Sequence, residues 1–184
     1  FMTLENILIR RANKVDLEGI VKIAKETFFQ DFQFDGKFSK DACHYLFDNA
    51  LKDYNEAVYV ATQDTKILGF AYYLNKPPTN GTVILEMMGV KKTAQGKGIG
   101  TKLTVESADQ FIKELKHYGI NNIATIYLTV SLDNLVAQKV YLKAGYEKIA
   151  EVPGLVGKDG SEIIMIKRVS DISYRKGIWT KPKP

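Results

Sequence analysis

The chain has 184 residues, of which 45% are hydrophobic and 26% are charged, and its formal net charge is +5. These values are ordinary for one globular domain that is large enough to bury a core without disulfide bonds or structural metal ions. No apolar run approaches the roughly 20 residues that cross a bilayer. With two histidines and one cysteine, Cys43, the chain also has a poor inventory of metal ligands, so we expect neither a membrane segment nor a metal.

The positive charge is spread along the chain rather than gathered in one stripe. Small groups occur at Lys91-Lys92 and near the C-terminus, at Arg175, Lys176, Lys181 and Lys183. No aromatic residues are interleaved with them in a stripe, which argues against nucleic-acid binding, and a modest positive balance suits an anionic cofactor equally well. The lone cysteine cannot form an intramolecular disulfide, which favours a cytoplasmic location.

Hydrophobic periodicity predicts a strand and two helices in the first part of the chain. Residues 7–12 form the strand, and a helix follows with Asp16 as its N-cap. Apolar residues recur at helical spacing in that helix: Leu17, Ile20, Val21, Ala24 and Phe28. After an aromatic and acidic stretch over residues 29–38, Ser39 caps a second helix.

From Ala57 onward the pattern alternates between strands and helices. Strands are predicted over residues 58–62, 67–74, 83–90, 123–130, 146–152 and 162–168, and helices over 99–118 and 134–144. This order predicts one α/β domain over residues 2–170, a mixed sheet with helices on both faces. Residues 171–184 form a polar tail that we expect to be peripheral.

A glycine-rich loop joins the strand over 83–90 to the long helix. It reads Gln95-Gly96-Lys97-Gly98-Ile99-Gly100, and glycines at alternate positions permit positive φ and leave backbone N–H groups uncovered. Together with the helix dipole, such groups can hold a diphosphate without a metal. Phosphate loops of the Walker A and dinucleotide-binding types fit the spacing less well. A purely structural glycine turn is the alternative.

Two segments resemble the GNAT superfamily of N-acetyltransferases. The loop resembles the signature Q/R-x-x-G-x-G/A, and residues 133–146 resemble the family's N-x-x-A-x-x-x-Y-x-K-x-G-F/Y block. In the second segment Asn134 can cap a helix and Gly145 can end it. The resemblance covers about residues 7–168, and the part before Ala57 matches only in outline.

The resemblance implies an acetyl-CoA-dependent N-acetyltransferase that acetylates a primary amine directly. It implies a central sheet whose fourth and fifth strands, 83–90 and 123–130, splay apart. The implied coenzyme-binding residues are Met88, Gly89, Val90, Gln95, Gly96, Lys97, Gly98, Ile99, Gly100, Thr101, Asn134 and Tyr141. A bulge at Gly89 would aim main-chain donors at the acetyl oxygen. Alternatively, that glycine only relieves crowding against a helix.

Two residues are candidates for catalysis. Tyr141 matches the family tyrosine that lies near the coenzyme sulfur as general acid, although a core tyrosine with a local hydrogen bond is the alternative. Glu86 is a carboxylate inside an apolar strand, where an unpaired charge is costly, so we expect it to line a wet cavity as the base. It could instead face solvent or pair with a basic group. Thr129 stands where some relatives carry a second glutamate, so the base is Glu86 or ordered water alone.

The acceptor site is expected to come largely from the first two helices and the loop between them. The residues there combine aromatic walls with carboxylates, which suits a cationic amine, although the aromatics could simply pack: Phe28, Phe29, Asp31, Phe32, Phe34 and Asp35. The sequence slightly favours a small-molecule amine such as a polyamine over a peptide N-terminus or a protein lysine. The alternative is a catalytically silent acetyl-CoA-binding sensor or partner module. The assembly state is left open, with a homodimer as one option.

Overall fold

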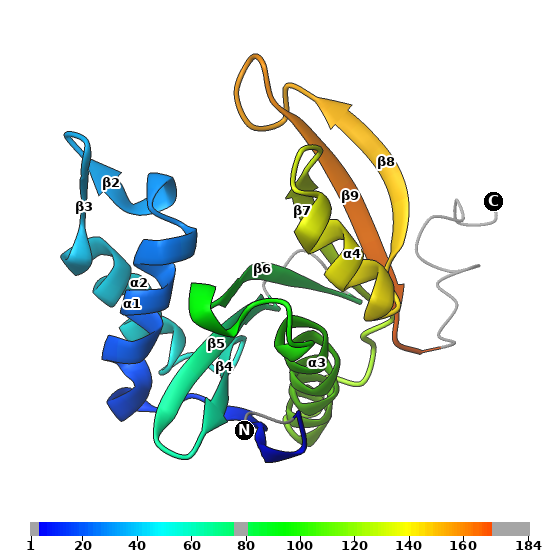
Figure 1. The fold of residues 1–184 in the computed structure, drawn as a ribbon. Coiled ribbons are helices and arrows are strands. Elements are labelled where there is room, and N and C mark those ends of the chain that lie inside the picture. Colours follow the sequence, from blue (N-terminus) through cyan, green and yellow to red (C-terminus); the bar gives the residue numbers. More distant parts are fainter. Residues whose placement is uncertain (1–3, 76–80, 171–184) are drawn as a thin grey trace, which may run out of the picture.

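The computed structural model describes residues 4–75 and 81–170, and it contains one seven-stranded sheet (Figure 1). The strand order is β1-β4-β5-β6-β7-β9-β8. The strands are β1 (Leu8–Arg11), β4 (Glu56–Gln63), β5 (Lys66–Leu74), β6 (Thr82–Val90), β7 (Thr125–Ser131), β8 (Glu147–Pro153) and β9 (Ser161–Arg168). Neighbouring strands are antiparallel except β6 and β7, which are parallel. The mixed sheet predicted from the sequence is therefore confirmed.

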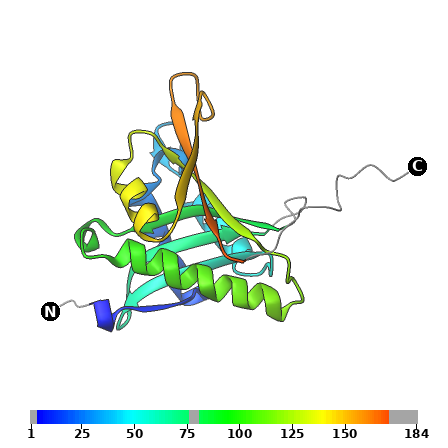
Figure 2. The same ribbon diagram turned by 90° about the vertical axis from the view of Figure 1, so that its right-hand side faces the viewer.

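Helices cover both faces of the sheet, also as predicted (Figures 1 and 2). Helices α1 (Leu17–Thr27) and α2 (Lys40–Ala50) pack on one face, and α3 (Ile99–His117) and α4 (Leu135–Lys143) pack on the other. Strand β4 contributes alternate residues to the two resulting cores. Val58 and Val60 join the core under α1 and α2, whereas Tyr59 joins the core under α3.

Strands β6 and β7 part soon after they meet, which confirms the expected splay. Their register holds only from Thr82–Thr125 to Ile84–Tyr127. On its other side β6 pairs with β5 along most of its length, but Tyr72 lies opposite Met87 while Tyr73 lies opposite Leu85. Glu86 is therefore the extra residue of a β-bulge. The bulge expected at Gly89 is wrong, because Gly89 pairs regularly with Phe70.

The three predicted N-cap residues, Asp16, Ser39 and Asn134, all occupy cap positions, and two of them form a capping hydrogen bond. Ser39 caps α2, and the side chain of Asn134 accepts a hydrogen bond from the Ala137 amide at the start of α4. Asp16 occupies the N-cap position of α1, as predicted, but its side chain makes no capping hydrogen bond there. Its carboxylate instead accepts two hydrogen bonds from Arg10, at 2.7 and 2.8 Å, and one from the Asn13 amide.

A small hairpin, β2 (Gln33–Phe34) and β3 (Lys37–Phe38), lies within the stretch for which no element was predicted. Its turn residues Asp35 and Gly36 have φ values of 50° and 71°, which is the left-handed geometry that two-residue hairpin turns use. The predicted peripheral tail, residues 171–184, lies outside the described residues. Within the described part of the chain, no helix is long and apolar enough to span a membrane.

Candidate active site

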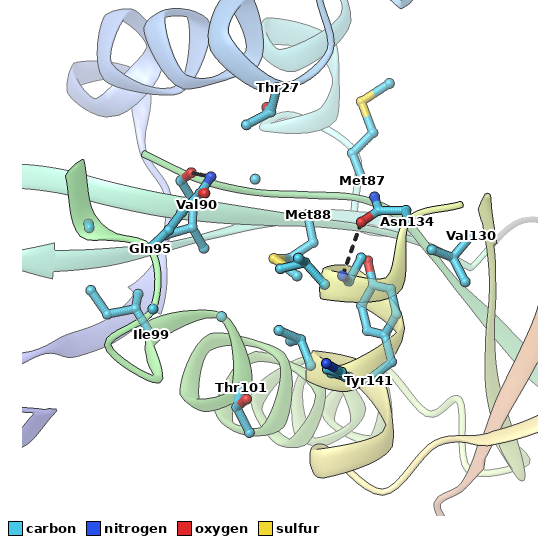
Figure 3. Close-up of a pocket in the computed structure, with 18 of the residues that line it drawn as sticks. Thr27, Met87, Met88, Val90, Gln95, Ile99, Thr101, Val130, Asn134 and Tyr141 are labelled. Carbon is cyan, nitrogen blue, oxygen red and sulfur yellow. Dashed lines mark hydrogen bonds between the residues drawn. The ribbon is translucent and has the colours of Figure 1, made fainter. Parts of the chain in front are cut away.

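A cavity of about 630 Å³ lies where β6 and β7 part (Figure 3). Five segments that are distant in the sequence form its walls. They are the last turn of α1 and the following residue (26–28), β6 (86–90), the glycine-rich loop with the start of α3 (94–101 without Lys97), the end of β7 (130–131) and α4 with its cap (134–143). The splay of two strands thus creates the space, and the helices on both faces close it.

The glycine-rich loop presents main-chain donors to this cavity. Gly96 and Gly98 have φ values of 75° and 80°, which side chains rarely tolerate, and Gly98 is the N-cap of α3. The first amides of an α-helix have no intrahelical partner, so those at the start of α3 are free to bind an anion. The Gln95 side chain donates to the Val90 carbonyl at 2.9 Å and ties the loop to β6. Lys97 lies outside the cavity and donates to the Thr93 carbonyl at 3.2 Å.

Tyr141 extends from α4 into the cavity, on the same side as Asn134 (Figure 3). Its side chain is 7% exposed, and burial raises the pKa of the phenol to about 12. The ring lies 5.8 Å from the ring of Tyr146. No hydrogen bond joins the Tyr141 hydroxyl to any other described residue, so this proton donor is available to a ligand. The local hydrogen bond considered as an alternative is absent there.

Glu86 reaches the cavity because the bulge turns it away from the regular ladder. The side chain is exposed in the cavity, yet the protein atoms around it remove enough water to raise its pKa above the usual glutamate range. Within the described residues it has no hydrogen bond or ion pair. The alternative in which a basic group pairs with it therefore has no support.

Met88, Gly89 and Val90 line the cavity along β6. In an antiparallel pair alternate amides point away from the partner strand, and beyond Ile84 those of β6 face the space that β7 has left. Gly89 is a glycine for a steric reason, as the crowding alternative expected. A Cβ there would meet Thr27 Oγ1 of α1 at 2.8 Å.

Four of the residues that the sequence suggested for the acceptor site, Phe29, Asp31, Phe32 and Asp35, lie outside this cavity. Phe32 is buried against the rings of Phe38 and Phe47, Phe29 lies on the surface, and Asp31 and Asp35 are exposed. Phe28, which the sequence also suggested for the acceptor site, does line the cavity. The cavity is further lined by residues that the sequence analysis did not single out: Glu26, Thr27, Met87 and Ser131.

The described residues contain no group of three or more histidine, cysteine, aspartate or glutamate side chains that could hold a metal ion. The donors that line the cavity suit coenzyme A instead. Uncovered amides at a helix N-terminus fit a diphosphate. A gap edged by unpaired strand amides fits an extended chain with amide groups, and an unpartnered phenol can reach a sulfur atom.

Known proteins share this architecture. The profile described as "Acetyltransferase (GNAT) family" matches residues 17–146. An uncharacterized N-acetyltransferase of Methanocaldococcus jannaschii is 28% identical over 88% of this chain and 92% of its own length. An N-alpha-acetyltransferase of Sulfurisphaera tokodaii is 26% identical over 77% of this chain and 80% of its own.

Among solved structures, spermidine N-acetyltransferase from Vibrio cholerae, in complex with CoA and spermine, is similar with a TM-score of 0.69. It is 18% identical, and the match covers 89% of this chain and 96% of that one, so this likeness shows the fold. The family profile spans more than half of the chain and includes the glycine-rich loop and Tyr141. The chain is therefore a member of the GNAT family of acetyltransferases, and acetyl-CoA is its cosubstrate.

Proposed function

We propose that this enzyme transfers the acetyl group of acetyl-CoA directly to a primary amine, and that small-molecule amines such as polyamines are preferred over peptide N-termini and protein lysines. One observation carries the proposal. A carboxylate, Glu86, and a phenol, Tyr141, line the same cavity, and neither side chain has a hydrogen-bond partner among the described residues. These groups match the two proton transfers that amine acetylation requires.

In the proposed reaction the amine nitrogen attacks the thioester carbonyl carbon, and the carbon–sulfur bond then breaks. Glu86 takes the proton that the amine loses, directly or through a water molecule. Tyr141 donates its proton to the departing sulfur, so that the products are an amide and a free thiol. Outward-facing amides of β6 between Met88 and Val90 polarise the carbonyl oxygen. Holding both reactants in one cavity supplies the orientational advantage of a direct transfer.

The coenzyme is assigned to the α3 side of the cavity. We propose that the amides from Gln95 to Thr101 hold its diphosphate, and that Asn134 lines the path of the arm that carries the thioester. The left-handed conformations of Gly96 and Gly98 support this placement, because they keep side-chain atoms away from the amides.

The preference for a small cationic amine rests on the acceptor side of the cavity. The carboxylates of Glu26 and Glu86 attract a cation there, and Phe28 and Met87 provide apolar contact. The structural neighbour described as a spermidine N-acetyltransferase supports the polyamine choice. The relative described as an N-alpha-acetyltransferase makes a peptide N-terminus the competing substrate.

The test is release of free thiol from acetyl-CoA in the presence of spermidine, other diamines and peptides. Cys43 is the only cysteine and is buried, so the enzyme itself contributes little thiol signal. We expect turnover with the amines, and a Tyr141→Phe variant whose kcat falls about 100-fold while coenzyme affinity changes little. Turnover with peptides alone would contradict the acceptor choice. Binding of acetyl-CoA without any turnover would support the silent-module alternative.

We also propose a cytoplasmic location, which the single, buried thiol of Cys43 supports.

We further propose a homodimer that forms through β8. This strand lies at the edge of the sheet and is exposed, so its outer main-chain groups have no neighbouring strand to pair with. Light scattering on the purified protein tests this proposal, and a mass of one chain would contradict it.

A further inference from the structure

Gln138 is a buried polar residue on α4 that the catalytic proposal does not use. Its side chain is 2% exposed, and every hydrogen-bonding atom of its amide has a partner. The amide nitrogen donates to the carbonyls of Ser131 and Leu132, at 3.0 and 2.8 Å. The amide oxygen accepts from Lys148 Nζ of β8 at 2.7 Å. These bonds join three elements at one point.

Lys148 also determines which way the Gln138 amide faces. An ammonium group only donates hydrogen bonds, so the atom next to it must be the amide oxygen. The amide nitrogen, with its two hydrogens, is then directed at the two carbonyls of the loop. Both carbonyls only accept, so the arrangement has one consistent orientation.

The loop that Gln138 holds forms part of the active site. It connects β7 to α4, and its residues Ser131 and Asn134 line the cavity. The Leu132 amide donates to the Ser161 carbonyl at 2.8 Å, which fixes the other side of the loop to β9. The loop is therefore held from both sides, and the Gln138 side chain is one of its contacts with α4.

Besides Gln138, the N-terminal half of α4 is held by the Asn134 cap and by Ala137, which packs partly buried against the core. The fully buried side chains of the helix are Gln138 and Tyr141, while Leu135 and Val136 at its start are 61% and 73% exposed. Residues three apart lie on the same side of a helix, so Gln138 and Tyr141 face the protein together. The position of the phenol along the cavity therefore depends on the amide clamp one turn before it.

We propose that Gln138 is a positioning residue for acetyl transfer. It holds the start of α4 against the end of β7, so that the Tyr141 hydroxyl stays within reach of the coenzyme sulfur. This inference rests on the acid role proposed above for Tyr141. It predicts that the two residues act as one unit in catalysis.

The experiment is a double-mutant cycle with Gln138→Met and Tyr141→Phe, assayed as kcat for thiol release at saturating acetyl-CoA and amine. Methionine keeps the length of the side chain but cannot donate to the carbonyls. We expect Gln138→Met to lower kcat about tenfold, and the double variant to be no slower than Tyr141→Phe alone within about twofold. A residue that only stabilised the fold would give independent, multiplying effects.

Gln110→Met is the matched control. Gln110 on α3 also donates from a partly buried amide to a main-chain carbonyl, that of Ile9 at 3.0 Å, but Ile9 belongs to β1, which does not line the cavity. Its kcat should stay within about twofold of the wild type. If Gln138→Met does not fold, Gln138→Glu serves in its place, because it keeps the shape and the Lys148 contact while an ionised carboxylate cannot donate.

The outcomes distinguish the positioning role of Gln138 from the acid role of Tyr141. Wild-type kcat in a folded Gln138 variant, or multiplying effects in the cycle, overturns the positioning role and leaves the acid role of Tyr141 intact. Wild-type kcat in Tyr141→Phe instead overturns the acid role, and the inference built on it falls as well. A slow Gln138 variant with no further loss in the double variant supports both.

Discussion

Substitution of Gly89 by alanine tests how closely α1 approaches the floor of the cavity. The added Cβ would meet Thr27 Oγ1 at 2.8 Å, Phe70 Cε1 at 3.0 Å and Ile23 Cγ2 at 3.1 Å. Two of these atoms belong to α1 and one belongs to β5, so the methyl group is confined between two layers. Overpacking of this kind costs about 1–3 kcal/mol. For a chain of this size that corresponds to a fall in Tm of roughly 2–12 °C.

Calorimetry and urea unfolding measure this loss directly. Gly100→Ala is the matched control, because its new Cβ finds its nearest neighbour, Val140 Cγ1, at an ordinary 3.4 Å, and it should lose no stability. Adding Thr27→Ala removes the nearest obstacle, so the double variant with Gly89→Ala should lose less than the sum of the two single variants. If Gly89→Ala melts within about 1 °C of the wild type, α1 and β6 are not packed as tightly as described.

Three further predictions concern the site. Glu86→Gln should abolish the acidic limb of the kcat/KM pH profile. In the wild type, activity should rise as the pH rises through this limb, because the base must be deprotonated. The limb should lie above the usual glutamate range, because the pKa of Glu86 is raised. A limb that survives the substitution assigns it to another group. Gly98→Asp forces a left-handed φ of 80° on a side chain and sets a carboxylate at the diphosphate site, so CoA binding measured by calorimetry should weaken more than tenfold. Tyr146→Phe removes a buried hydroxyl without a hydrogen-bond partner and should raise the free energy of unfolding by about 1 kcal/mol, whereas a loss would reveal a partner for it.

Most helices and strands were predictable because hydrophobic periodicity and the residues at their ends mark them within a short stretch of sequence. Gly98 marked the start of α3, Asn134 and Gly145 marked the two ends of α4, and Gly145 has the left-handed φ of 88° expected after a helix. The hairpin at residues 33–38 was missed although Asp35-Gly36 is a strong turn signal. Its strands are two residues long, too short to show alternation.

The site was predictable only in part, because two of its features depend on long-range geometry. The bulge falls at Glu86 rather than Gly89 because β5 and β6 slip by one residue there, and nothing local in the sequence marks that slip. Composition pointed to Phe28, Phe29 and Asp31 alike for the acceptor, but of these three the packing of α1 on the sheet brings only Phe28 into the cavity. Which end of a helix meets the sheet is decided by the whole core.

The short register between β6 and β7 has a mechanical consequence. Among the described residues, three ladder pairs and the bonds at Gly81 join the four strands on one side to the three on the other, and contacts between α3 and α4 connect the two halves as well. A long molecule with amide groups that binds in the gap would hydrogen-bond to both β6 and β7 and so connect the two halves of the sheet. Binding of this molecule should therefore slow hydrogen exchange along the unpaired edges of β6 and β7. It should also slow exchange in the paired segments 82–84 and 125–127, which the molecule does not touch.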